Sequence, residues 1–290
     1  MSSIKIKKSI AFLGWVIRIS RPRIWMYTAG PFFFGLLFWY QDFSFFLNIH
    51  FILLFLWLTL PANVFLYALN DAFDYETDLK NPKKQGFELR SSVGDKEPLI
   101  SIATISGLTF LFFFFDLSLP LKTLSILWFM IVITYNGPPF RFKSIPVADL
   151  LFAFTYYLWG IFGYYLASGQ PLSLLAILLM AFFGITMHIY SSSGDIEYDK
   201  NAGVRTISTV LGSVRDNILV CIALCMVILM ISAATGLWYV SLTILLYIAF
   251  FLVHFLYGSR ATLLGWYRHF IFLHYVAGGI LTLTVIYGYA

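Results

Sequence analysis

The chain has 290 residues, of which 60% are hydrophobic and only 11% are charged, and its formal net charge is +5. A soluble domain usually carries about 25% charged residues, so this composition excludes an ordinary soluble protein. It predicts a protein embedded in a bilayer, where lipid-facing side chains need no protein partner. The small positive charge fits membrane topology rather than a surface for nucleic acid, so no nucleic-acid partner is expected.

Nine apolar runs are long enough, or nearly so, to cross the hydrocarbon as helices, which takes about 20 residues with a range of about 17–25. We therefore predict an all-α, polytopic membrane protein with about nine transmembrane helices in a bundle, forming one domain over residues 1–290. The predicted spans are Ile24–Tyr40, Phe51–Leu69, Leu99–Phe115, Leu121–Tyr135, Val147–Ala167, Leu172–Ser191, Ile218–Ala234, Leu237–Tyr257 and Phe270–Tyr287.

The lysines and arginines predict the orientation of these spans. All except Lys122 precede the first span or fall in the loops after the second, fourth, sixth and eighth spans. Basic loops stay in the cytoplasm, so we expect the N-terminus and these four loops there, with residues 1–20 as a basic cytoplasmic segment. No signal peptide is expected. Cys221 and Cys225 lie one turn apart inside the seventh span, where packing is their expected role.

The acidic residues gather in two of the predicted cytoplasmic loops. The run Asn70–Asp78 follows the second span, and the run Asp195–Asp199 follows the sixth. On a continuing helix, residues 71, 74 and 78 share one face, and so do residues 195 and 199. Like charges at this spacing repel unless a cation joins them, and Mg²⁺ is held by carboxylates together with substrate phosphates. One such run would be a solvated helix end, but two facing runs predict a cage for a Mg²⁺-bound diphosphate.

Basic side chains accompany both runs. Lys200 and Arg205 follow the second run, and Arg141 and Lys143 follow the segment Tyr135–Pro139 in the loop between. Arginine and lysine bind phosphate oxygens by charge-assisted hydrogen bonds. The competing interpretation of each one is simply the excess of basic residues in cytoplasmic loops.

The pattern Asn70-Asp71-x-x-Asp74-x-x-x-Asp78, together with Asp195-x-x-x-Asp199, resembles the paired aspartate motifs of the UbiA superfamily of intramembrane prenyltransferases. Residues 135–143 resemble that family's loop between the fourth and fifth helices, and the resemblance covers nearly the whole chain. Within the family, residues 20–32 and 78–84 are similar to the lycopene elongase branch, which prenylates a carotenoid.

This resemblance implies Mg²⁺-dependent transfer of an isoprenyl group from an isoprenyl diphosphate to a lipophilic acceptor in the membrane, in a cavity that faces the cytoplasm. It implies roles in catalysis for Asp71, Asp74, Asp195 and Lys143. The implied Mg²⁺ ligands are Asn70, Asp71, Asp74, Asp78, Asp195 and Asp199. The implied substrate-binding residues are Asn70, Arg141, Lys200, Arg205, Tyr135 and Arg23.

Several alternatives stay open. The acceptor is a polyene such as lycopene, or else an aromatic or quinone precursor, for which Arg23 would bind an acidic group. His188, shortly before the second run, is a candidate proton acceptor, with packing as the competing interpretation. From another class, a membrane transporter would place ionisable residues near the midplane, whereas these acids lie at the ends of predicted helices.

Overall fold

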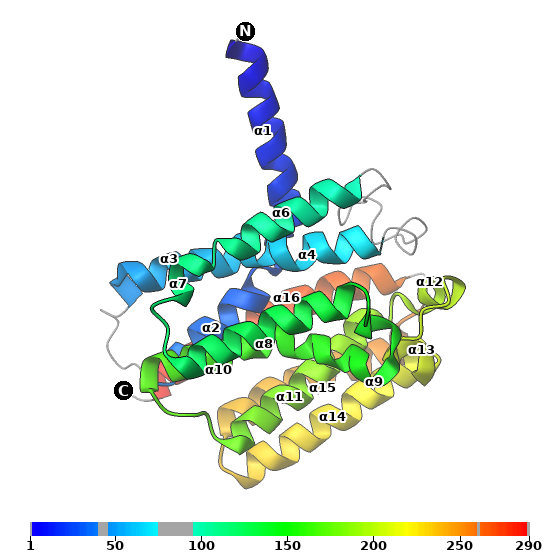
Figure 1. Ribbon diagram of the computed structural model, residues 1–290. Helices are drawn as coiled ribbons and strands as arrows, with labels where there is room; N and C mark the ends of the chain where they lie inside the picture. Colours follow the sequence, from blue (N-terminus) through cyan, green and yellow to red (C-terminus); the bar gives the residue numbers. More distant parts are fainter. Residues whose placement is uncertain (1, 40–45, 75–94, 260–261, 289–290) are drawn as a thin grey trace. The chain divides into compact units, whose positions relative to one another are not determined.

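The computed structural model describes residues 2–39, 46–74, 95–259 and 262–288, and the regular structure in these ranges is helical (Figure 1). Within them, eight helical segments are long and apolar enough to cross a membrane. The predicted all-α membrane class is therefore confirmed. The first predicted span differs, because α2 (Met26–Leu37) has only 12 residues, or about 18 Å at 1.5 Å per residue. It begins only after the 3₁₀ turn that Pro22 opens.

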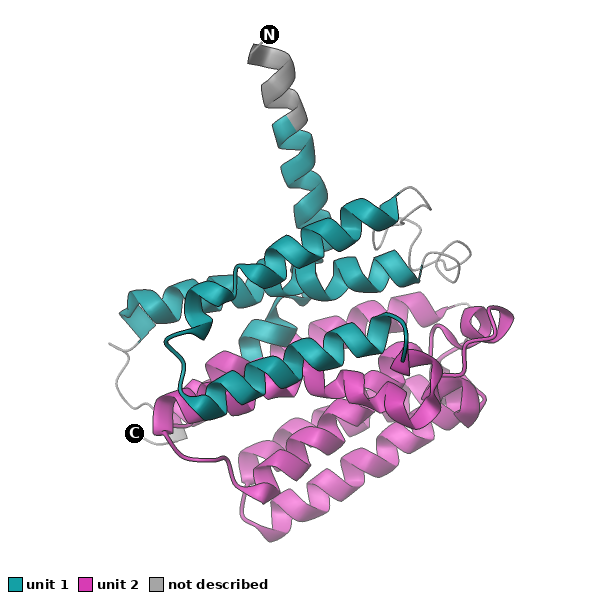
Figure 2. Cartoon of the chain, viewed as in Figure 1, with its two compact units in different colours: residues 1–30, 43–140 teal, residues 31–42, 141–290 magenta. Residues whose placement is uncertain are grey.

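The chain divides into two compact units, which Figure 2 colours separately. Unit 1 comprises residues 1–30 and 43–140, and unit 2 comprises residues 31–42 and 141–290. The helix α2 therefore contributes its first residues to unit 1 and the rest to unit 2. The single domain expected over residues 1–290 stays a prediction.

Unit 1 holds the helices that correspond to the second, third and fourth predicted spans. Two of these spans are each built from two shorter helices, with breaks near Leu60 and Thr109. The elements are α1 (Ser2–Ile19), the 3₁₀ turn η1 (Pro22–Ile24), α3 (Ile49–Thr59), α4 (Pro61–Phe73), α6 (Lys96–Leu108), α7 (Leu111–Phe114) and α8 (Leu119–Asn136).

The break between α3 and α4 is stabilised by a buried amide. Pro61 starts α4, and proline has no N–H to continue the helical hydrogen bonds. The side chain of Asn63, which is 0% exposed, donates through Nδ2 to the carbonyl oxygens of Leu58 and Thr59 and to Thr28 Oγ1, at 2.7–2.8 Å. In hydrocarbon, backbone groups must be satisfied by the protein itself, so Asn63 fixes the direction in which α4 leaves the break.

We expect Asn63→Ala to lower the free energy of unfolding by about 1–3 kcal/mol, because buried acceptors lose their donor. Thermal unfolding of the purified protein in detergent measures this effect. The matched control is Thr104→Val on the exposed side of α6, which should stay within about 0.5 kcal/mol of the parent. Equal effects of the two changes would contradict the role given to Asn63.

Unit 2 holds the last five predicted spans, each of which is found as a helical segment at nearly the predicted place. The elements are the 3₁₀ turn η5 (Phe142–Ser144), α9 (Pro146–Asp149), the 3₁₀ turn η6 (Leu150–Ala153), α10 (Phe154–Ser168), α11 (Leu174–Ser192), α12 (Ile196–Asn201), α13 (Ile207–Leu211), α14 (Val214–Ala234), α15 (Trp238–Tyr257) and α16 (Leu263–Gly288).

In unit 2, α10 and the second part of α2 approach backbone to backbone. A Cβ atom built on Gly163 would collide with the carbonyl oxygen of Phe32, and one on Gly35 would collide with that of Gly160. Small residues allow such close approach between membrane helices. The glycines therefore set the spacing of these two helices.

We expect Gly163→Ala to destabilise the protein by about 1–3 kcal/mol, because the added methyl group overpacks a contact with backbone. Gly278→Ala in α16 is the matched control, since no atom lies within 4 Å of its added Cβ. Thermal unfolding in detergent measures the stability of both variants, and only Gly163→Ala should be less stable than the parent. A control as unstable as Gly163→Ala would contradict this account of the helix contact.

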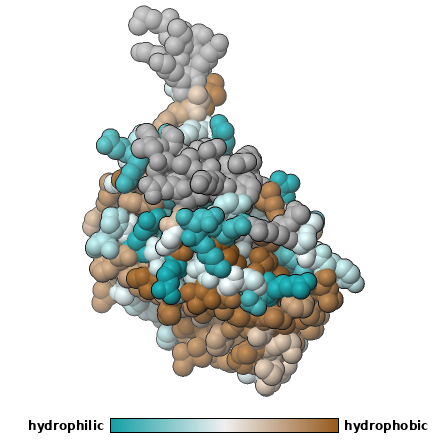
Figure 3. Space-filling view, turned by 90° about the vertical axis from the view of Figure 1, so that its right-hand side faces the viewer, coloured by the Kyte–Doolittle hydropathy of each residue, from teal (hydrophilic) through white to brown (hydrophobic). Residues whose placement is uncertain are grey.

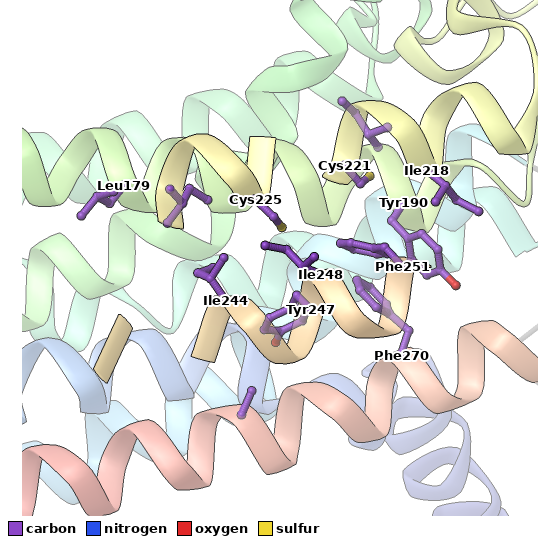
Figure 4. Close-up of a cluster of buried hydrophobic side chains, with 13 residues drawn as sticks. Leu179, Tyr190, Ile218, Cys221, Cys225, Ile244, Tyr247, Ile248, Phe251 and Phe270 are labelled. Carbon is purple, nitrogen blue, oxygen red and sulfur yellow. The ribbon is translucent and has the colours of Figure 1, made fainter. Parts of the chain in front are cut away.

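The core of unit 2 lies among α11, α14, α15 and α16 (Figure 4). Cys221 and Cys225 are free thiols, both 0% exposed, in the middle of this core, so they pack as predicted. On α15 the buried side, with Tyr247 and Phe251, is backed by an exposed apolar side that includes Leu245 and Leu256. Figure 3 shows apolar side chains over much of one face, as expected for a lipid-facing surface.

Candidate functional site

The first aspartate run begins inside the last turn of α4. Asp71 is 0% exposed and Asp74 is 4% exposed. The helix ends at Phe73, and Asp74 is its C-terminal cap, with its N–H donating to the carbonyl oxygen of Asn70 at 3.0 Å. The expected helical face through Asp78 is therefore interrupted at residue 74, and Asp78 itself lies outside the described residues.

Asp71 pairs with an arginine that the sequence analysis did not select. Arg21 Nη2 donates to Asp71 Oδ1 at 2.7 Å, and the two side chains are 9% and 0% exposed. The same guanidinium lies over the ring of Tyr67, with its Cζ 4.3 Å from the ring centre. A buried ion pair that stacks on an aromatic ring uses the planar guanidinium in a way that lysine does not reproduce.

The backbone at Arg21 is also unusual. Its φ of 51° and ψ of 70° place it in the left-handed region at the start of η1, which costs roughly 1–2 kcal/mol for a residue with a Cβ. In sequence, Arg21 looked like one more basic residue before the first span. The contacts with Tyr67 and with Asp71, fifty residues later, distinguish it in the folded protein.

Asn70 orients Asp74 rather than lying alone beside it. Its Nδ2 donates to Asp74 Oδ2 at 2.8 Å and to Asn136 Oδ1 at 3.1 Å. Asn136, the last residue of α8 and 0% exposed, donates in turn to the Val132 carbonyl at 2.8 Å. These contacts connect the end of α4 to the end of α8, which also carries the buried Tyr135.

The second aspartate run, in unit 2, does not continue α11. That helix ends at Ser192, and Asp195 is the N-terminal cap of the separate short helix α12. The Asp199 N–H donates to the Asp195 carbonyl at 2.8 Å, so the two aspartates are one helical turn apart, as predicted. Asp199 is 8% exposed, while Asp195 is half-buried.

The basic residues of unit 2 fall into two groups. Lys143, in η5, is 8% exposed, and Arg141 is half-buried at the start of that turn with a left-handed φ of 45°. Lys200 and Arg205 are exposed, and Lys200 Nζ donates to the Gly212 carbonyl at 3.0 Å. Arg23, in unit 1, is exposed as well.

A further carboxylate, which the sequence analysis passed over, lies beside His188. Asp149, at the end of α9, is 1% exposed, and its Oδ1 lies 3.0 Å from His188 Nε2. Its Oδ2 accepts a hydrogen bond from the Ile207 N–H at 3.0 Å. Asp149 stands alone in sequence, so no spacing pattern marks it.

The donor groups suit a hard divalent cation. In the described ranges no three histidine, cysteine, aspartate or glutamate side chains gather to hold a metal by themselves. Mg²⁺ does not require such a cluster, because it commonly uses one or two carboxylates, water and substrate phosphates. Asp71 and Asp74 supply carboxylate oxygens at the end of α4, and Asp195 and Asp199 supply them at α12. Each pair thus offers ligands that suit Mg²⁺ bound to a diphosphate.

Residues 24–287 match the model of the UbiA prenyltransferase family. The chain belongs to this family. It is therefore a membrane-embedded enzyme, a prenyltransferase. The match spans both compact units, which agrees with the resemblance read from the aspartate runs.

Relatives with assigned activities agree with the narrower resemblance. The chain is 35% identical over 204 residues to a lycopene elongase/hydratase of Haloarcula japonica, covering 69% of this chain and 68% of the relative. It is 31% identical over 289 residues to a lycopene elongase/hydratase of Corynebacterium glutamicum, covering 93% of this chain and 96% of the relative.

Solved structures with the same fold are more distant in sequence. A UbiA homologue from Archaeoglobus fulgidus, bound to DMAPP and Mg²⁺, has a TM-score of 0.62 at 18% identity and covers 93% of this chain and 98% of its own. A homologue from Aeropyrum pernix K1, without ligand, has a TM-score of 0.61 at 18% identity, covering 92% and 98%. At this identity the likeness shows the UbiA fold.

Proposed function

We propose that this UbiA protein transfers an isoprenyl group from an isoprenyl diphosphate, with Mg²⁺, to a carotenoid polyene such as lycopene. The observation that carries the proposal is the pair of acidic helix ends, Asn70–Asp74 and Asp195–Asp199, each in a unit that also buries a cation, Arg21 or Lys143. The names of the relatives support the polyene acceptor, and DMAPP in a homologue of the same fold supports the donor.

The chemistry begins with cleavage of the C–O bond of the donor, whose electron pair leaves with the pyrophosphate. Mg²⁺, when bound, would neutralise charge on the diphosphate oxygens. Lys143 and Arg141 supply fixed positive charge for the leaving group, and such preorganised charge lowers the barrier where negative charge develops. Asn70 holds Asp74, and Arg21 holds Asp71, in the orientation needed to receive the ion.

The allylic cation is then attacked by a double bond of the acceptor, which forms the new C–C bond and leaves a cation on the product. Loss of a proton or addition of water completes the reaction. An aromatic face such as that of the buried Tyr135 stabilises a nearby cation by about 0.5–2 kcal/mol.

Membranes that contain the protein, Mg²⁺ and labelled dimethylallyl diphosphate test this function. Lycopene and an aromatic quinone precursor are offered in parallel, and the product is identified by mass. We expect Mg²⁺-dependent label in an extended carotenoid. Label in the aromatic product alone would keep the prenyltransferase and overturn the polyene acceptor.

The distribution of basic residues predicts which side of the membrane the site faces. We propose that the N-terminus and the aspartate loops face the cytoplasm. Accessibility of a single cysteine placed at Asn201, in a background without Cys221 and Cys225, to a membrane-impermeant thiol reagent tests this in inside-out vesicles. Labelling from the opposite side would reverse the topology.

A further inference from the structure

One buried carboxylate in unit 2 joins three segments of the chain. Asp149 ends α9, its Oδ1 contacts His188 Nε2 on α11 at 3.0 Å, and its Oδ2 accepts from the N–H of Ile207, the first residue of α13, at 3.0 Å. A carboxylate that is 1% exposed is costly to bury without such partners. The two contacts therefore hold Asp149 and its partners in one arrangement.

These contacts lie on either side of the second aspartate run. His188 precedes Asp195 and Asp199 in the chain, and Ile207 follows them. A second set of contacts joins the same two helices, because Ser208 Oγ lies 2.6 Å from Ser192 Oγ and donates to the Ile189 carbonyl at 3.1 Å. The loop 193–206 is thus closed at its base by side chains from α9, α11 and α13.

Asp149 also connects this loop to the buried cation of unit 2. Its own N–H donates to the Ile145 carbonyl at 2.7 Å, directly after η5, which carries Lys143. Asp149 therefore contacts both the segment that follows Lys143 and the helices that flank the loop 193–206. The relative placement of these segments can therefore be tested at the Asp149 contacts.

We propose that Asp149 is a positioning residue for the second aspartate motif, fixing the loop 193–206 relative to Lys143 so that the motif receives the Mg²⁺-bound diphosphate. This inference rests on the proposed function. The physical reason is that a displacement of about 1 Å at a reacting centre can cost about 100-fold in rate. Asp149 acts through His188 and Ile207 and does not itself touch the substrate.

The sharpest test removes one hydrogen bond without touching Asp149. Ile207 is the first helical residue of α13, and Thr206 before it has φ −82° and ψ 167°, a conformation compatible with a following proline. Proline is well accepted at a first helical position. Ile207→Pro therefore deletes the N–H that Asp149 accepts while α13 keeps its start, and Ile207→Val keeps the N–H as the matched control.

Two measurements are made on the full-length protein in nanodiscs. Hydrogen–deuterium exchange of residues 193–206, without Mg²⁺ or donor, reports on the loop itself, and the Mg²⁺ dependence of prenyl transfer reports on the site. For Ile207→Pro we expect faster exchange in this segment and about a tenfold or greater increase in the Mg²⁺ concentration for half-maximal transfer. Ile207→Val should match the parent in both.

The second variant, Asp149→Asn, should shift both readouts in the same direction, and if it fails to fold, Ile207→Pro alone decides. Lower thermal stability with unchanged Mg²⁺ dependence would assign Asp149 to the fold alone and overturn the proposal, as would unchanged exchange in Ile207→Pro. If the parent transfers no isoprenyl group to any acceptor, the proposed function fails. The exchange measurement then still decides whether Asp149 holds the loop.

Discussion

Replacing Asp74 by asparagine should lower kcat/KM for prenyl transfer by about 10²–10³, the usual cost of removing one preorganised electrostatic group from an active site. The change keeps the shape of a side chain that is 4% exposed and keeps an oxygen that Asn70 can reach, but it removes the negative charge. If Asp74 binds the cation, the loss should appear as a raised Mg²⁺ requirement.

Asp116→Asn is the control for this change, since Asp116 belongs to the same unit but is exposed between α7 and α8. Initial rates are measured over a series of Mg²⁺ concentrations at saturating donor. Activity of Asp74→Asn within about threefold of the parent would remove Asp74 from the proposed metal site.

Arg21→Ala should have the second large effect, and on two properties at once. It breaks the buried ion pair with Asp71, which typically costs about 3–5 kcal/mol of stability, and it removes a cation from the acidic end of α4. Thermal unfolding in detergent and prenyl-transfer rates are measured on the same preparations. Arg21→Lys should retain only part of either property, because an ammonium does not stack on Tyr67 as a guanidinium does.

Two further variants separate the two roles of Arg21. The double variant Arg21→Ala/Asp71→Ala removes both partners, so stability should partly recover while transfer stays low. Arg18→Ala, an exposed residue one turn earlier in the chain, should leave both unchanged. Recovery of activity together with stability in the double variant would show that the ion pair serves the fold and that neither residue takes part in the reaction.

Much of the fold was predictable because bilayer solvation leaves a strong pattern. A run of about 20 apolar residues predicts a transmembrane helix. The lysines and arginines, with the exception of Lys122, precede the first span or lie in alternate loops, which supports the predicted number of spans. Interruptions inside spans were harder to predict. Pro61 was visible in the sequence, yet the break needs Asn63 as a donor, and the contact of Asn63 with Thr28 joins residues far apart in the chain.

The candidate site was predictable where a motif repeats a spacing and unpredictable where one residue acts alone. The aspartates of both runs were selected as candidates from their spacing, and Lys143 from its place in the loop. Arg21 and Asp149 were missed because each is connected to a candidate residue, Asp71 or His188, only by a contact that forms on folding. Arg21 and Lys143 are buried, whereas Arg23, Lys200 and Arg205, which the sequence analysis named as substrate-binding residues, are exposed.

The glycine contact between α2 and α10 has a consequence for how the protein is made. The segment that includes Phe32 and Gly35 leaves the ribosome early, but its partners Gly160 and Gly163 are synthesised only after the whole of residues 43–140. Contacts between distant parts of a chain form late. Unit 2 therefore cannot complete its packing while the first half of the chain is being synthesised. During that time the short helix α2 lacks its contact with α10, so an insertase or chaperone would have to hold α2 in the membrane until α10 is made.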